Sequence, residues 1–229
     1  MSTSLSERMN IFLQPTPFLD SDSEEVQAFA RRSTGSALEP LDQAVKLFYA
    51  VRDEIRYDPY NIELTSEGFK ASVILRKGYG YCVAKAVVLA AAARTLGIPS
   101  RVGFADVRNH LSTERLRQLM KTDVFIFHGY SELFLDNRWV KATPTFNLSL
   151  CQRFGVKPLD FDGRSDALLH SYDIQGHRHM EYVRDHGAFP DLPLETIITS
   201  FRKHYPFYFE QGGVAKGDFE QEAKAEKVY

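Results

Sequence analysis

The sequence predicts an α+β fold in which a buried helix packs on an antiparallel sheet. Apolar residues recur every three or four positions in the first part of the chain, and their period changes to two after about residue 100. Between these parts, the segment from Cys82 to Leu96 is apolar on nearly every side, which is typical of a helix inside a core. Helices first and strands afterwards favour an α+β arrangement.

Start and stop signals place the helices that precede the buried one. Serines that can cap a helix stand before an acidic first turn, and Pro40 suits the first position of the next helix. Asp58-Pro59 ends that second helix, and Gly78 and Gly80 form a tight loop ahead of Cys82. We expect these helices from Ser21 or Ser23 to Arg32, from Pro40 to before Asp58, and from Lys70 to Arg76.

Alternating apolar residues predict three strands in the second part of the chain. They are expected at Arg101–Val107, Val124–Leu135 and Arg138–Thr143. Asp136-Asn137 is typical of a two-residue hairpin turn, which pairs Phe134 with Trp139 and Glu132 with Lys141. The same register pairs Tyr130 with Thr143 and His128 with Thr145. It also puts Val124, Ile126 and His128 on one face of the strand.

The remainder of the chain is predicted to form an annex to this core. Residues 158–186 are rich in Asp, Gly and His and favour a long loop, residues 195–205 favour a helix, and residues 211–229 favour a frayed or weakly docked tail. A length of 229 residues suits one domain. We therefore expect a single domain over residues 1–229, with its core at about residues 40–147.

Charge and cysteine content exclude several classes of protein. The 28 basic and 30 acidic residues give a net charge of -2, so we expect neither a nucleic-acid nor a membrane partner. The sequence shows neither a signal peptide nor an apolar stretch long enough to cross a bilayer, and we expect a cytoplasmic protein. Two cysteines are too few for a disulfide framework or a four-thiolate zinc site. The oligomeric state stays open.

Cys82 is the candidate nucleophile. It follows Gly78-Tyr79-Gly80-Tyr81 and begins the buried helix, where unpaired N–H groups and the helix dipole stabilise a thiolate and an oxyanion. We therefore expect its pKa to be lowered. The alternative is that Cys82 is a small apolar residue at the start of a core helix. Cys151 lacks such a setting and is interpreted as structural.

His128 is the candidate base, and Thr143 is the candidate residue that orients it. In the predicted register Thr143 is the diagonal neighbour of His128 on the same face, so its hydroxyl could accept a hydrogen bond from one ring nitrogen. The other nitrogen would then be available to Cys82. The alternative is a half-buried strand histidine with a satisfied hydrogen bond.

These segments jointly resemble the transglutaminase-like superfamily. The resemblance covers about residues 40 to 147 and rests on Ala71 to Cys82 with the helix after it, and on His128-Gly129-Tyr130 through Trp139-Val140. It implies a papain-like fold and Cys–His–Asp acyl-transfer chemistry, with Cys82 as nucleophile and His128 as general base. The family usually has Asp-Pro-Thr after the tryptophan strand, whereas this chain has Thr143-Pro144-Thr145. Thr143 therefore occupies the place of the aspartate.

We expect a thiol-dependent acyl-transfer enzyme without a cofactor, a hydrolase or transamidase that acts on a peptide, protein or small amide. Hydrolysis is favoured over cross-linking, and transfer to an amine stays open. The alternative is a catalytically weak or silent relative that binds a peptide or protein partner in the same cleft, since a hydroxyl stabilises an imidazolium less than a carboxylate does. A third, weaker alternative is a metal-assisted hydrolase. It would use the cluster of His170, Asp173, His177 and His179, but no fixed ligand spacing is evident, and we expect a loop or lid beside the cleft and no metal.

Overall fold

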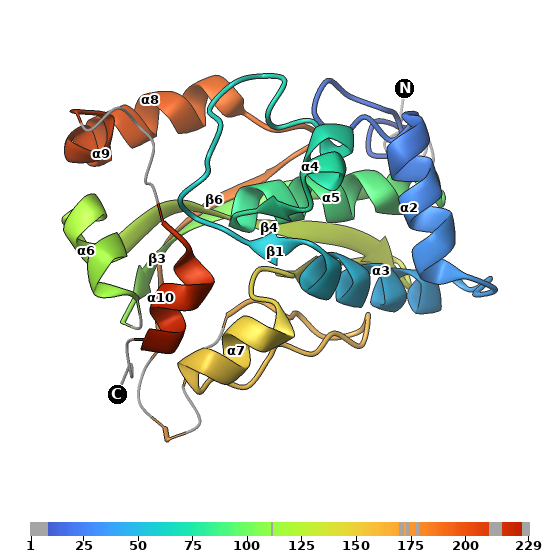
Figure 1. Cartoon of the computed structure of the whole chain (residues 1–229). Helices are drawn as coiled ribbons and strands as arrows, with labels where there is room; N and C mark the ends of the chain where they lie inside the picture. Colours follow the sequence, from blue (N-terminus) through green and yellow to red (C-terminus); the bar gives the residue numbers. More distant parts are fainter. Residues whose placement is uncertain are drawn as a thin grey trace.

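The computed structural model describes residues 9–110, 112–169, 172, 175–176, 179–210 and 217–225. Its first half is helical, as predicted, and Figure 1 shows helix α5 lying along the sheet with α2 and α4 beside it. The Ser23 hydroxyl accepts a hydrogen bond from the Val26 N–H, so Ser23 caps α2. The helices of this half are α2 (Glu24–Thr34), α3 (Pro40–Glu54), α4 (Ala71–Lys77) and α5 (Cys82–Thr95).

Strands in the order β5-β4-β3-β6 form an antiparallel sheet of four strands. Its members are β3 (Ser100–Asn109), β4 (Val124–Leu135), β5 (Arg138–Ala142) and β6 (Met180–Phe189). A separate parallel pair joins β1 (Arg56–Tyr57) to β2 (Tyr79–Gly80), directly before the nucleophile helix. The predicted α+β class and the packing of α5 on β4 are both confirmed.

The hairpin between β4 and β5 has the predicted register near its turn. Phe134 pairs with Trp139 and Glu132 with Lys141, while Asp136 and Asn137 have positive φ, as a tight hairpin turn requires. The ladder ends at the pair Ser131–Ala142, however, so the predicted pairs Tyr130–Thr143 and His128–Thr145 are wrong. The chain leaves β4 there because the Thr143 N–H donates to the Ala167 carbonyl at 2.8 Å.

A β-bulge at Phe127 interrupts the alternation of β4. Ala105 pairs with His128 but Val107 pairs with Phe125, so β4 carries one extra residue, and Phe127 has a φ of 52°. Phe125 and Tyr130, five positions apart, consequently pack against the same core cluster. The predicted common face for Val124, Ile126 and His128 is therefore wrong, because the bulge reverses the strand's parity between Ile126 and His128.

The Asp106 side chain holds this bulge. Its Oδ1 accepts the Phe127 N–H at 3.0 Å and lies 2.7 Å from the Nε2 of His186, whose ring stacks on Phe127. Tyr205 secures the strand just before the bulge, since its hydroxyl accepts the Ile126 N–H at 2.7 Å and donates to the Val124 carbonyl. Residues from β3, β6 and a C-terminal helix thus determine the course of β4.

The second half contains elements that the sequence pattern did not reveal. Strand β6 lies within and beyond the predicted loop of residues 158–186, and helix α10 lies in the predicted tail, so both predictions are wrong for those described residues. Helix α8 confirms the helix predicted at residues 195–205. The remaining helices are α6 (Glu114–Met120), α7 (Leu148–Phe154), α8 (Leu194–His204), α9 (Pro206–Glu210) and α10 (Phe219–Ala225).

Helix α10 lies beside α7, as Figure 1 shows. Ion pairs to α7 and α6 surround one buried ring of α10. Glu220 pairs with Arg153 at 2.7 Å and Glu222 pairs with Arg115 at 3.1 Å, while Phe219 is buried in the smaller of two core clusters. The larger cluster surrounds α5. Within the described part of the chain, no helix is long and apolar enough to span a membrane.

Lys85 ties α5 to the end of α3. It is fully buried, and its ammonium donates to the carbonyls of Arg52 at 2.8 Å and Ile55 at 2.7 Å, which are among the unpaired acceptors at the C-terminal end of α3. Burial lowers the pKa of Lys85 to about 7. The nucleophile helix is thus fixed by polar as well as apolar contacts.

Replacing the residue that holds the bulge should destabilise the protein. We expect Asp106→Ala to lower the free energy of unfolding by about 1–3 kcal/mol, because the Phe127 N–H loses its acceptor. The matched control is Asp123→Ala, which removes an exposed carboxylate paired with Arg108 and should cost less than about 0.5 kcal/mol. Chemical denaturation measures both. Equal effects of the two substitutions would contradict the proposed role of Asp106.

Candidate active site

Cys82 is the first residue of α5 and is only 7% exposed. Gly78 ends α4 in the left-handed conformation, and the chain then passes through β2 into α5. A Cβ on Gly80 would lie 2.7 Å from the Cβ of Ala84, so only glycine allows β2 to approach the first turn of α5 this closely. The residue before Cys82 provides no side-chain cap, which leaves the first N–H groups of α5 without that partner.

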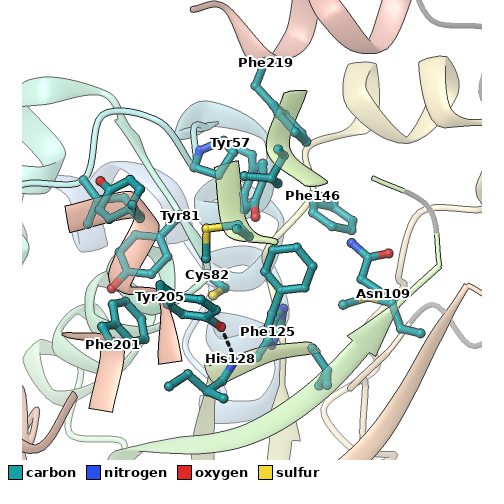
Figure 2. A pocket seen from close by; sticks show the side chains of 18 of the residues that line it. Tyr57, Tyr81, Cys82, Asn109, Phe125, His128, Phe146, Phe201, Tyr205 and Phe219 are labelled. Carbon is teal, nitrogen blue, oxygen red and sulfur yellow. Dashed lines mark hydrogen bonds between the residues drawn. The ribbon is translucent and has the colours of Figure 1, made fainter. Parts of the chain in front are cut away.

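Strand β4 touches the start of α5 at Gly129. A Cβ on Gly129 would lie 2.7 Å from the Cα of Val83, so a side chain there would push the strand away from the helix. The backbone N–H of Gly129 lies close enough to the Cys82 thiol to act to lower its pKa. This contact brings the strand position next to His128 against the thiol, and Cys82 and His128 line the same pocket (Figure 2).

The electrostatic environment of the thiol differs from the prediction. Burial raises the pKa of Cys82 to about 11, although the N–H groups of Gly129, Val83 and Cys82 itself act to lower it. The expected lowered pKa is therefore wrong, because loss of water around the thiolate outweighs the helix N-terminus. This direction favours the neutral thiol of Cys82 over the thiolate at physiological pH.

Thr143 lies just beyond the end of β5 and is 3% exposed. Its Oγ1 has no hydrogen-bond partner among the residues that the structure describes, so the predicted bond to His128 is not formed in this structure. Thr143 also does not line the pocket that holds Cys82 and His128. The structure thus brings Cys82 and His128 together in one pocket and places Thr143 outside that pocket.

Aromatic rings dominate the pocket. Figure 2 shows Tyr57 and His128 on opposite sides of Cys82. Phe125, Phe146 and Asn109 lie toward the right of that view. Burial raises the pKa of Tyr57 well above its ordinary value, so this phenol stays protonated as a hydrogen-bond donor. The lining residues are Tyr57, Pro59, Ile62, Tyr81, Cys82, Val107, Asn109, Leu116, Met120, Phe125, Ile126, His128, Phe146, Phe154, Met180, Phe201, Tyr205, Tyr208 and Phe219.

Most of these lining residues were not identified from the sequence. Tyr57 follows directly after a long helix and before Asp58-Pro59, a position that the sequence pattern only marks as a helix end. Phe201, Tyr205 and Phe219 come from the C-terminal segments, where the sequence shows no motif. The apolar face of the helix at residues 195–205 was a usable signal, since it had to pack against some other surface.

The structure places only part of the predicted histidine cluster. His170, Asp173 and His177 lie outside the described residues. His179 is buried, and its ring stacks on Phe146 with the centroids 6.0 Å apart. Among the described residues, no three His, Cys, Asp or Glu side chains are grouped so that they could hold a metal ion.

Comparisons with known proteins give distant structural similarities. No curated protein sequence matches the chain significantly. A "putative cysteine protease" from Cytophaga hutchinsonii superposes with a TM-score of 0.49 and 16% identity over 80% of this chain and 56% of that chain. A "putative protease" from Parabacteroides distasonis gives 0.39 and 19% over 62% and 27%. The chain thus spans little more than half of the first protein and about a quarter of the second.

A family model gives the decisive match. The model of the transglutaminase-like superfamily matches residues 27–144, slightly more than half of the chain. The matched range contains the helix that begins at Cys82, the strand that carries His128, and Thr143. The chain therefore belongs to the transglutaminase-like superfamily.

Proposed function

We propose that the protein is a thiol-dependent acyl-transfer enzyme that hydrolyses a peptide, protein or small amide. The observation that carries this proposal is the shared pocket of Cys82 and His128 at the start of a buried helix. A nucleophile and a base in one water-poor pocket are the minimum that thiol-based acyl transfer needs. Because both cysteines are free thiols, a reducing compartment such as the cytoplasm suits this chemistry.

In the proposed mechanism the Cys82 sulfur attacks the carbonyl carbon while His128 takes the thiol proton. A C–S bond forms, the carbonyl oxygen becomes an oxyanion, and N–H groups at the start of α5 together with the Tyr57 hydroxyl are the available donors for it. His128 then returns the proton to the leaving amine as the C–N bond breaks. Water, deprotonated by His128, finally splits the thioester to the carboxylic acid and restores the thiol.

The raised pKa of Cys82 favours a protonated thiol in the resting site over a preformed thiolate. Proton transfer then accompanies attack on the substrate, as in enzymes that use a serine. In this proposal Thr143 orients His128 once substrate is bound, because its buried hydroxyl is unused by the described residues and hydrogen bonds in active sites often tighten only in the complex.

The second candidate function is a silent relative that binds a peptide or protein partner in the same pocket. Two observations favour it: the thiol is protonated at neutral pH, and a hydroxyl stands in the place of the family's carboxylate. Formation of a covalent acyl-enzyme separates the two candidates, since a silent relative forms none.

Acylation of Cys82 tests the proposed function. We expect a p-nitrophenyl ester to transfer its acyl group to wild-type protein, giving an adduct on Cys82 by intact mass and peptide mapping. Cys82→Ala should give none, and His128→Ala should slow acylation by about 10²–10⁴-fold, the usual contribution of a general base. Cys151→Ala is the matched control, because Cys151 is the other buried free thiol but lies outside the pocket. An unchanged rate in His128→Ala would refute the mechanism.

The pH dependence of alkylation tests the neutral state of the thiol. Thiolate is the reactive form, and the folded pKa of about 11 lies above that of an ordinary cysteine. We therefore expect the rate of iodoacetamide alkylation at Cys82 to rise about tenfold per pH unit from pH 8 to 10. In urea-unfolded protein the same cysteine should level off near pH 9. A plateau below pH 8 in the folded protein would reveal a preformed thiolate instead.

Substitutions at Thr143 test its orienting role. We expect Thr143→Val, which keeps the shape and removes the hydroxyl, to slow acylation of Cys82 by about fivefold, since one hydrogen bond is worth about 1 kcal/mol. Thr143→Ser should retain most of the rate. Stopped-flow release of p-nitrophenolate measures both variants, and melting temperatures exclude a loss of folding. Equal rates for Val and Ser would remove Thr143 from the mechanism.

A further inference from the structure

The pocket beside Cys82 contains no charged partner for a substrate. Among the described residues, no aspartate, glutamate, lysine or arginine lines it, and its polar lining atoms come from Cys82, His128, Asn109 and the tyrosines. An isolated carboxylate or ammonium loses its hydration in such a place without compensation. The lining therefore discriminates against a charged group in the part of the substrate that enters it.

The pocket is also small, with a free volume of about 70 Å³. Its walls include rings from separate elements, with Phe125 on β4, Phe201 on α8 and Phe219 on α10. Such walls offer apolar contacts to a short hydrocarbon chain.

Segments beyond the family core contribute part of the walls. The matched family range ends at residue 144, and Phe146, Phe154, Met180, Phe201, Tyr205, Tyr208 and Phe219 follow it. Cys82, His128 and the other lining residues lie inside the range. The matched core thus provides Cys82, His128 and most of the lining, and the C-terminal segments complete it with further rings.

We propose that this pocket, which the C-terminal segments complete, is an acyl-binding pocket selective for a short, uncharged aliphatic acyl group next to the scissile bond. The inference rests on the proposed function, because the selected group is the one whose carbonyl carbon Cys82 attacks. Its physical basis is the aromatic lining, the small volume and the lack of an aspartate, glutamate, lysine or arginine among the described lining residues.

Three p-nitrophenyl esters with a common leaving group test the selectivity: the hexanoyl ester, its 5-carboxypentanoyl analogue and its 6-aminohexanoyl analogue. In each, the Cys82 sulfur forms a bond to the acyl carbon, His128 accepts the thiol proton, and p-nitrophenolate leaves with the electrons of the broken C–O bond. We expect the hexanoyl ester to acylate Cys82 about 100-fold faster than either charged ester. Equal rates would overturn the selectivity and leave the nucleophile in place.

Met120 is a position in the pocket where a charge can be introduced at the end of a flexible side chain. It is the last residue of α6, half-buried, and lines the pocket. We expect Met120→Lys to lower the ratio of the hexanoyl to the 5-carboxypentanoyl acylation rate by about fivefold or more. The reason is that the flexible lysine ammonium can pair with the carboxylate of the charged ester. Met120→Leu is the matched control and should keep the wild-type ratio. An unchanged ratio in Met120→Lys would contradict the placement of the acyl chain in this pocket.

Binding measured without chemistry separates the two levels of the proposal. Saturation-transfer NMR should detect hexanamide on Cys82→Ala protein and not the 5-carboxypentanamide or 6-aminohexanamide ions. Selective binding without acylation of wild-type Cys82 would refute the proposed enzyme and support the pocket inference. Acylation of Cys82 together with equal binding of the three amides would support the proposed enzyme and refute the pocket inference.

Discussion

The contact between Gly129 of β4 and the first turn of α5 is the constraint on which the site depends. There is no room for a side chain between the Gly129 backbone and Val83, and the Gly129 N–H acts to lower the pKa of Cys82. The helix end and the strand thus meet backbone to backbone. Polar contacts on both elements maintain this approach. Lys85 binds α5 to the end of α3, and Asp106 and Tyr205 hold the residues of β4 just before His128.

Much of the fold follows from local sequence signals. Val124–Leu135 has the same bounds in the structure as in the prediction, because alternation and a turn signal mark both of its ends. With the family established, the predicted transglutaminase-like core is confirmed. The bulge at Phe127 was not predictable, since its cause is the side chain of Asp106 on another strand. Strand β6 was missed because it is an edge strand, exposed along most of its length, and so lacks an apolar period.

The site was predictable to a different extent. Cys82 stands out because its glycine loop and buried helix are contiguous in sequence, and His128 because it lies on a strongly patterned strand. The pocket around them is assembled from residues between 57 and 219 that share no spacing. Two opposing effects determine the charge state of the Cys82 thiol, namely the helix N-terminus and the loss of hydration on burial. A helix N-terminus contributes up to about 2 kcal/mol, whereas removing a thiolate from water costs more, and only the structure reveals how complete that removal is.

Helix α10 has a consequence for how the pocket responds to its surroundings. Phe219 closes one wall of a pocket whose described lining has no aspartate, glutamate, lysine or arginine. The helix that presents Phe219, however, is held by the ion pairs Glu220–Arg153 and Glu222–Arg115 at the protein surface. Salt screens such partly exposed pairs and leaves apolar packing largely intact. The docking of α10, and with it the position of Phe219, therefore depends on ionic strength. An uncharged ligand that contacts only rings and methylenes would still bind with a salt-dependent affinity.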